Sequence, residues 1–385
     1  MYLSACLQHR KTHHQRVLNT MSSPAYKIAI LDDYQNVAEP YFLNLKDSHP
    51  GIFEVTSFPE TLPAFNLACQ ADQQKLVERL RPFDIISTMR ERTPFPASLL
   101  RELPNLKLLL TTGERNLGID SKAARELGIV VAGAPGRGDS GQVKPVSRID
   151  STTQHVWALI LGITRKITQS DVAVKSGKWQ IGFATGIAQK TIGLVGLGRL
   201  GGLTGFIAKT AFDMNVICWS RNLTQDAADE RAQALGLEAE DFNGVKTFRV
   251  VSKEELFKSA DIVSIHYILS ESTRGIVGNP ELSLMKNSSF LINTSRGPIV
   301  DESALLEVLK AGRIRGAAID VFEVEPLPLH SEWRTTKWGE NGASDVLLSP
   351  HMGYVEEMTL RNWYIENAEN VRRWANGQSL LFQLN

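Results

Sequence analysis

Short apolar runs alternate with stretches of mixed polar and apolar residues from position 27 onward. The first apolar runs are rich in Ile, Val and Leu, as buried strands are, and cover 27–31, 53–58, 84–89, 106–112 and 129–134. Helical stretches between them include 72–80, 97–102 and 120–127. Strands that alternate with helices predict a parallel sheet covered on both faces, so we expect a first α/β domain here.

The alternation stops at 135–150, a segment rich in Gly, Pro and polar residues that predicts a loop or linker. A long apolar helix follows, with Asp150, Ser151 or Thr152 as its expected N-cap. A loop that contains Gly and Trp, 177–186, then leads to a second series of elements.

The second series also alternates strands and helices. Its strands are predicted at 191–195, 215–219, 247–251, 261–266, 289–293, 316–321 and 345–349. Its helices are predicted at 203–212, 227–235, 253–258, 280–285 and 302–311. A last helix, 356–376, returns to the first domain, because an inserted domain leaves its two ends close together.

We therefore expect an α/β protein of two domains, since 385 residues are too many for one compact core. The predicted boundaries are 25–150 with 352–385 for the first domain and 151–351 for the second. Residues 1–24 are expected to be a disordered N-terminal extension.

The N-terminal 31 residues contain no Asp or Glu but four basic residues, which is a bias of mitochondrial presequences. The segment is also His-rich and poorly amphipathic, and Met21 offers an alternative start directly before the first strand. We expect a cytoplasmic protein whose first 20 residues are an extension or a start-site artefact. Mitochondrial targeting stays open as the alternative.

The charge balance and the cysteine content limit the classes of partner that we expect the chain to bind. Forty-two basic residues balance forty-two acidic ones, which gives no field to attract nucleic acid or an anionic membrane. Cys6, Cys69 and Cys218 show neither metal-binding spacing nor a disulfide framework, so no metal is expected. The apolar runs are too short to span a bilayer. The partners should be small molecules or a second copy of the chain.

A glycine cluster follows the strand at 191–195. Gly196, Gly198 and Gly201 have the spacing G-x-G-x-x-G, which permits a tight turn, backbone approach to a pyrophosphate and close packing of the next helix. The same spacing can also be a plain strand–turn–helix corner. The second strand at 215–219 completes a βαβ unit, and this context favours a dinucleotide site.

The residues after 215–219 bear on the choice of dinucleotide. NAD sites usually carry an acidic residue there, whereas this chain has Ser220, Arg221 and Asn222. A guanidinium can bind the 2′-phosphate of NADP, so NADP(H) is favoured and NAD(H) remains possible. The alternative is that Arg221 is an ordinary surface arginine.

Three charged or titratable residues follow three strands of the second domain: Arg296, Glu325 and His351. The carboxyl ends of parallel strands are where open α/β sheets bind ligands. Reduction of a 2-oxo acid needs a cation for the carboxylate and carbonyl, and an acid to protonate the alkoxide. We assign anchoring to Arg296, proton transfer to His351 and support of His351 to Glu325. Each residue taken alone could be a surface side chain.

Four ordered motifs carry a resemblance: TIGLVGLGRLG (191–201), INTSRGPIVDE (292–302), GAAIDVFEVEPLP (316–328) and LLSPHMGYVEE (347–357). Over residues 25 to about 376 the chain resembles the NAD(P)-dependent D-isomer-specific 2-hydroxyacid dehydrogenases. The resemblance implies the same Arg-Glu-His set and usually a homodimer. It also implies a flavodoxin-like substrate-binding domain with an inserted Rossmann dinucleotide-binding domain, and an active site in the cleft between them.

The resemblance extends the set of site residues. It implies that Asp320 holds the nicotinamide carboxamide, and that backbone N–H groups of Glu114 and Arg115 in TTGERNLGID (111–120) bind the substrate carboxylate. This loop departs from the commoner G-V-G-V-D form, 136–150 is longer than usual, and Ile268 replaces a common proline. The expected cofactor-binding residues are Gly196, Gly198, Arg199, Leu200, Gly201, Ser220, Arg221, Asn222, Thr294 and Asp320. The expected substrate-binding residues are Arg90, Gly113, Glu114, Arg115 and Arg296.

The leading hypothesis is an oxidoreductase that transfers a hydride between NADPH and a small 2-oxo acid, such as glyoxylate or hydroxypyruvate. The alternative is a dinucleotide-binding regulatory protein, similar to transcriptional corepressors of this fold, without substrate turnover. Retention of Arg296, Glu325 and His351 permits both, whereas the balanced charge gives no support for a role on chromatin.

Overall fold

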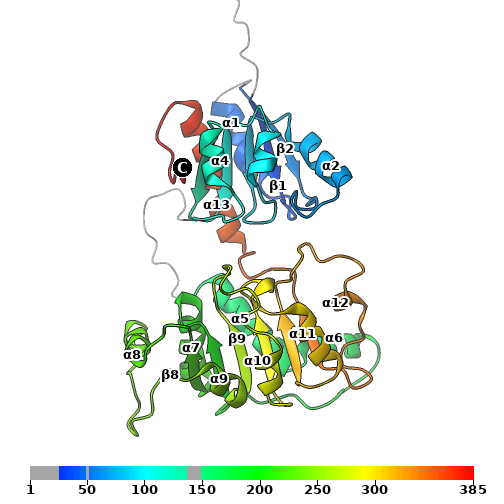
Figure 1. Ribbon diagram of the computed structural model, residues 1–385, viewed down its shortest axis with the longest axis vertical. Coiled ribbons are helices and arrows are strands. Elements are labelled where there is room, and N and C mark those ends of the chain that lie inside the picture. Colours follow the sequence, from blue (N-terminus) through cyan, green and yellow to red (C-terminus); the bar gives the residue numbers. More distant parts are fainter. Residues whose placement is uncertain (1–25, 49–51, 137–148) are drawn as a thin grey trace, which may run out of the picture. The chain divides into compact units, whose positions relative to one another are not determined.

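The computed structural model describes residues 26–48, 52–136 and 149–385 and divides into two compact units (Figure 1). The first unit comprises the chain up to Pro135 together with Trp363–Asn385, and the second comprises Gly136–Asn362. The second unit is therefore wider at both ends than the predicted 151–351. The predicted extension 1–24 and most of the predicted loop 135–150 lie outside the described residues.

The first unit contains a five-stranded parallel sheet in the order β2-β1-β3-β4-β5. This is the flavodoxin-like order that the family resemblance implied. Its strands are β1 (Tyr26–Leu31), β2 (Phe53–Phe58), β3 (Ile85–Thr88), β4 (Leu108–Thr112) and β5 (Val130–Ala134). Its helices are α1 (Glu39–Ser48), α2 (Gln70–Leu80), α3 (Ala97–Arg101) and α4 (Ser121–Glu126), with most of α13 (Glu357–Ala375).

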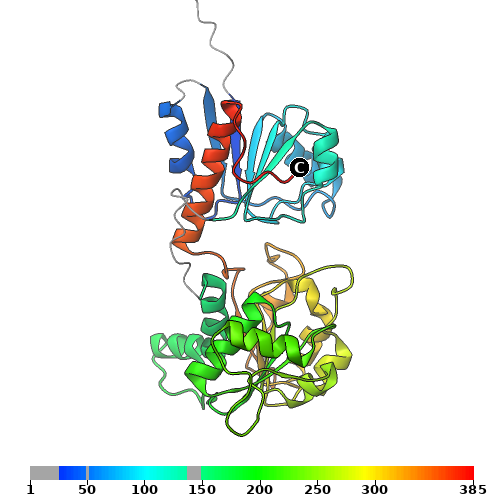
Figure 2. The same cartoon turned by 90° about the vertical axis from the view of Figure 1, so that its left-hand side faces the viewer.

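The last helix and the C-terminal residues are bound to this sheet. Figure 2 shows α13, in red, beside the sheet, where Asn367 donates to the Ser87 hydroxyl and Asn370 to the Gly133 carbonyl. The N–H of Leu384 donates to the carbonyl of Val131 in β5. The return of the chain to the first unit, predicted from the sequence, is confirmed.

The second unit contains a seven-stranded parallel sheet in the order β12-β11-β10-β9-β6-β7-β8. Counted from its own first strand, β6, this is the Rossmann order 3-2-1-4-5-6 with one more strand added. Its strands are β6 (Thr191–Val195), β7 (Asn215–Trp219), β8 (Arg249–Val250), β9 (Ile262–Ile265), β10 (Phe290–Asn293), β11 (Gly316–Ile319) and β12 (Asp345–Leu348). Its helices are α5 (Ser151–Thr164), α6 (Ile167–Lys175), α7 (Arg199–Phe212), α8 (Gln225–Ala234), α9 (Lys253–Ser259), α10 (Asn279–Leu284), α11 (Glu302–Lys310) and α12 (Glu332–Thr335), with a 3-10 turn at Gly297–Ile299.

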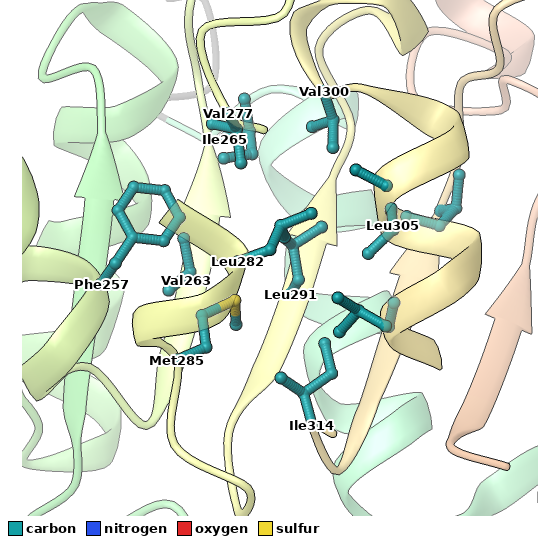
Figure 3. Packing of buried hydrophobic residues seen from close by; sticks show 14 of the residues in the cluster. Phe257, Val263, Ile265, Val277, Leu282, Met285, Leu291, Val300, Leu305 and Ile314 are labelled. Carbon is teal, nitrogen blue, oxygen red and sulfur yellow. The ribbon is translucent and has the colours of Figure 1, made fainter. Parts of the chain in front are cut away.

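In the sheet of the second unit, alternate side chains of a strand pack into two separate hydrophobic cores, because successive residues of a strand point to opposite faces. Val263, Ile265 and Leu291 meet apolar side chains of α9, α10 and α11 on one face (Figure 3). Ile262 and Ile292 meet those of α5, α7 and α8 on the other. With both faces buried the strands are apolar almost throughout, which made them easy to find in the sequence.

All twelve strands of the described residues lie within or within one residue of the predicted ranges. Helix α7 begins at Arg199, not at 203 as predicted, because Gly201 and Gly202 continue the helix instead of delaying it. Helices α1, α6 and α12 were not predicted. In α6 only Ala173 is buried, so its apolar residues form no stripe that a pattern could show. Among the helices of the described residues, none is both long and apolar enough to cross a bilayer.

The close packing of α7 on β6 gives a test of stability. A Cβ at Gly201 would overlap the Gly196 carbonyl oxygen, whereas a Cβ at Gly198 would meet nothing within 4 Å. We expect Gly201→Ala to lower the free energy of unfolding by roughly 1–3 kcal/mol. Gly198→Ala should change it by less than about 1 kcal/mol. Urea denaturation of both variants measures the difference, and equal losses would contradict this packing.

Candidate active site

Each glycine of the turn after β6 has a separate structural reason. Gly196 has a φ of +103° and lies so close to the carbonyl of His266 that a Cβ would come within 2.7 Å of its oxygen. Gly201 lies against the Gly196 carbonyl, which allows α7 to pack on the strand. Gly198 is the N-cap of α7, has no side chain to cap the helix and faces open space.

The N-terminus of α7 therefore fits an anionic group. The backbone N–H groups of its first turn have no side-chain cap, and Gly198 and Arg199 are exposed while Leu200 is half-buried. Arg199 forms an ion pair with Asp150, which is the N-cap of α5 and one of the three predicted candidates. The other oxygen of Asp150 accepts from the Thr153 N–H at 2.8 Å. An exposed cation beside free N–H groups is what the pyrophosphate of a dinucleotide requires.

The segment after β7 is fixed to the neighbouring strand end. The Arg221 N–H donates to the Tyr267 hydroxyl at 2.8 Å, and its guanidinium donates to the Ser272 carbonyl at 2.9 Å. Tyr267 in turn stacks on Trp219, the last residue of β7. Ser220 is half-buried, and Arg221 and Asn222 are exposed, so the arginine is held in place with part of its guanidinium open to a ligand.

His266 follows β9 and lies next to the glycine turn, a position that the sequence analysis did not use. Its backbone N–H donates to the Val195 carbonyl, and its Nε2 lies 2.9 Å from the Ser264 hydroxyl. Burial lowers the pKa of His266 to about 4. The imidazole is therefore neutral near pH 7 and adds no charge beside the turn.

The structure brings His351 and Glu325 together. The Nδ1 atom of His351 lies 2.6 Å from Oε2 of Glu325, while Oε1 accepts the Phe322 N–H at 2.9 Å. The ring of Tyr354 meets that of His351 edge-on, with centroids 5.4 Å apart. A carboxylate on Nδ1 orients the imidazole and leaves Nε2 for proton exchange with a substrate.

Arg296 belongs to a segment that abuts the one carrying Glu325. Gly297, the next residue, lies against the backbone of Phe322 and Glu323 so closely that a Cβ would overlap them. The Arg296 guanidinium donates to the Ser295 carbonyl at 2.8 Å, and its own carbonyl accepts from the Asn293 amide. Thr294, from the predicted cofactor set, is buried at the end of β10.

Asp320, at the end of β11, is fully buried and receives its hydrogen bonds from within the protein. Its carboxylate accepts from the N–H groups of Met352 and Gly353, at 2.8 and 3.1 Å, and lies 3.0 Å from Nε2 of His155. Burial acts to raise the pKa of Asp320, but the hydrogen bond and charge of His155, together with Ser349 and the Met352 N–H, hold it below its ordinary value. Its role at the nicotinamide carboxamide stays a prediction.

His155 is a site residue that the sequence analysis missed. It lies on α5, between a first turn that caps at Asp150 and the apolar residues that fill the core. The only signal in the sequence was that His155 is the one titratable residue of this helix. Its partners are 165 and 194 residues away along the chain, so no local pattern could reveal them.

In the first unit, the structure brings Arg90 and the 113–116 loop together. Arg90 follows β3 with a φ of +50°, and its guanidinium lies against Gly113, where a Cβ would overlap it. The guanidinium is also 5.9 Å from the centre of the Trp363 ring. The Asn116 amide donates to the Arg90 carbonyl, while Glu114 and Arg115 are exposed. Trp363 and Asn116 were not singled out from the sequence.

A buried acid supports the loop that carries Arg90. Asp32 follows β1 and accepts hydrogen bonds from the hydroxyls of Thr93, at 2.9 Å, and Thr61, at 2.5 Å. Burial raises the pKa of Asp32 above its ordinary value, although both threonines act against this. The ends of β1 and β3 are thereby tied to each other.

Comparison with known proteins places the chain in a family. The family profile described as D-isomer specific 2-hydroxyacid dehydrogenase, NAD binding domain, matches residues 157–353. The glyoxylate reductase of Thermococcus litoralis is 32% identical over 312 residues, which are 79% of this chain and 84% of that protein. The D-3-phosphoglycerate dehydrogenase of Bacillus subtilis is 31% identical over 313 residues, 80% of this chain but 52% of that protein.

Solved structures give the same result. The phosphoglycerate oxidoreductase of Vibrio cholerae superposes with a TM-score of 0.74 at 31% identity, and the match covers 91% of this chain and 99% of that one. The family profile, which matches residues 157–353, includes the glycine turn, the Arg296 segment, Glu325 and most of the turn that carries His351. The chain is an oxidoreductase that belongs to the D-isomer specific 2-hydroxyacid dehydrogenase family, which acts on CH–OH groups with a nicotinamide dinucleotide.

Proposed function

We propose that this oxidoreductase reduces a small 2-oxo acid, of the size of glyoxylate or hydroxypyruvate, with NADPH. The observation that carries the proposal is the His351–Glu325 pair, in the same unit as a glycine turn whose three glycines each have the required environment. A relative named glyoxylate reductase, of which the chain covers 84%, supports a small 2-oxo acid as substrate.

In this proposal each residue has one role in the reduction of the carbonyl group. A bound nicotinamide supplies the hydride to the carbonyl carbon. Arg296 binds the carboxylate and polarises the carbonyl oxygen. His351 donates the proton on Nε2 to that oxygen, and Glu325 stabilises the charged imidazole on its other side. In the reverse direction the neutral imidazole takes the proton from the hydroxyl group.

The first unit supplies the other substrate contacts of the proposal. The backbone N–H groups of Glu114 and Arg115, two exposed residues, bind the substrate carboxylate in this proposal, and Gly113 leaves the room that the Arg90 guanidinium occupies beside them. A guanidinium that is already held against an aromatic ring and a backbone turn loses little further conformational entropy when a ligand binds. This favours the binding of an anion.

The preference for NADPH rests on Arg221. No acidic residue stands at 220–222 to repel a 2′-phosphate, and the hydrogen bond to Ser272 holds the guanidinium close to the strand end. A charge-assisted contact to a phosphate is stronger than a neutral one, so this residue is the natural discriminator between the two dinucleotides.

The proposal includes a homodimer that forms through α6 and the following loop. Large exposed apolar side chains gather in this segment, namely Ile167, Val172, Val174, Trp179, Ile181 and Phe183. A sequence with zero net charge offers little electrostatic repulsion between copies. A cytoplasmic location also stays part of the proposal.

The acid–base role of His351 is tested by replacement with alanine. We expect His351→Ala to lower kcat for 2-oxo acid reduction by roughly 10²–10⁴-fold, because the proton donor is lost. The absorbance of reduced nicotinamide measures turnover. The control is His330→Ala, which removes an exposed histidine and should leave kcat unchanged. Wild-type inactivity across a broad panel of 2-oxo acids would instead favour the regulatory dinucleotide-binding alternative.

The cofactor preference is tested by Arg221→Ala. This change should weaken NADPH binding roughly 10- to 100-fold, the value of one charge-assisted contact, and leave NADH binding nearly unchanged. Fluorescence titration of both dinucleotides gives the affinities. Arg313→Ala is the matched control, because Arg313 is exposed and precedes β11 rather than following a strand. If Arg221→Ala weakened the binding of NADPH and NADH equally, the arginine would not bind the 2′-phosphate.

The self-association surface is tested with a double variant. Trp179→Ser with Phe183→Ser should convert a dimer into a monomer in sedimentation equilibrium, because it removes the two most exposed aromatic rings of the segment. Phe242→Ser is the control, since Phe242 is 96% exposed on another loop of the same unit. A monomeric wild type, or dissociation by the control, would rule this surface out.

A further inference from the structure

His155 joins two strand ends that meet at the candidate active site. Its Nε2 atom lies 3.0 Å from the Asp320 carboxylate, at the end of β11, and 3.0 Å from the Ser349 hydroxyl, which follows β12. The histidine itself projects from α5, which packs on the same sheet. The Nε2 atom of His155 thus connects α5 with the ends of two strands. The His155 side chain is about one-fifth exposed.

Asp320 holds the turn that carries His351 through both its backbone and its side chain. Its carbonyl accepts the His351 N–H at 2.7 Å, and its carboxylate accepts the N–H groups of the next two residues. His351 needs this support, because it has a φ of +56°, in the left-handed region that costs a non-glycine residue conformational energy.

The same turn is packed against the start of α5. A Cβ at Gly353 would lie 3.3 Å from a Thr152 side-chain carbon and 3.4 Å from the Asp320 carboxylate, so helix and turn are in contact at this point. A shift of Asp320 relative to α5 would therefore move the 351–353 backbone. The distance of 2.6 Å between His351 and Glu325 depends on that backbone.

We infer that His155 is a positioning residue for the proton-transfer histidine: by donating from Nε2 to Asp320 it fixes the turn that holds His351 on Glu325. His155 acts through Asp320 and is not itself a proton donor to the substrate. The inference rests on the proposed role of His351 for its kinetic consequence, but its structural consequence, the state of the His351–Glu325 hydrogen bond, does not need turnover.

Two amide substitutions of His155 test whether its effect depends on a donor that reaches Asp320 or only on a polar side chain. The amide nitrogen of His155→Gln takes the place of Nε2 and keeps the donor to Asp320, whereas that of His155→Asn takes the place of Nδ1 and is too short. We expect His155→Gln to keep kcat within about threefold of wild type and His155→Asn to lower it roughly 10- to 100-fold, the cost of a misplaced catalytic group. KM for the 2-oxo acid should change in neither variant.

A spectroscopic measurement keeps the inference testable without turnover. In protein labelled with ¹⁵N-histidine, the Nδ1 proton shared by His351 and Glu325 should give a far-downfield NMR signal, assigned by its absence from His351→Ala. The signal should persist in His155→Gln and disappear in His155→Asn. Gln154→Asn, an exposed neighbour on α5, controls for the lower helix propensity of asparagine and should leave signal and kcat unchanged.

The outcomes are distinct. Loss of kcat and of the downfield signal in His155→Asn alone supports the inference. A wild-type signal in His155→Asn overturns it, as does an equal loss in the two amide variants. A wild type without 2-oxo acid reduction but with the expected change of signal would refute the proposed function and leave the positioning role of His155 in place.

Discussion

A buried carboxylate has to be surrounded by hydrogen-bond donors, and the site in the second unit depends on how Asp320 meets this requirement. The ends of β11 and β12 meet here because both strands are parallel and adjacent. Two backbone N–H groups of the 351–353 turn and one imidazole from α5 satisfy the carboxylate. The position of the turn, and so of His351, follows from the burial of this charge.

Each unit carries polar or charged groups at the carboxyl ends of its strands. The glycine turn, Arg221, and the pair of Glu325 with His351 all lie at strand ends of the second unit, in agreement with the rule that open α/β sheets bind ligands at their carboxyl edge. Arg90 and Gly113 lie at strand ends of the first unit, and the rule applies there in the same way. In the proposal, cations and backbone donors at these strand ends bind the anionic ligands, although the whole sequence carries no net charge.

Much of the fold was predictable because the sheets are buried on both faces and their strands are continuous apolar runs. The glycine turn and the pairing of His351 with Glu325 were also foreseen, since strand ends in a parallel sheet must meet. Helix α6 was missed because its apolar side chains face outward instead of forming a stripe. His155 and Trp363 were missed because their roles arise from contacts between residues far apart in the chain.

A crystal structure with reduced dinucleotide and oxamate, a non-reducible analogue of a 2-oxo acid, would show whether His351 faces the reacting carbonyl group. We expect Nε2 of His351 to lie within hydrogen-bond distance, about 2.6–3.2 Å, of the oxamate carbonyl oxygen, with Glu325 still on Nδ1. An imidazole turned away from the ligand, or a different acid at that oxygen, would contradict it.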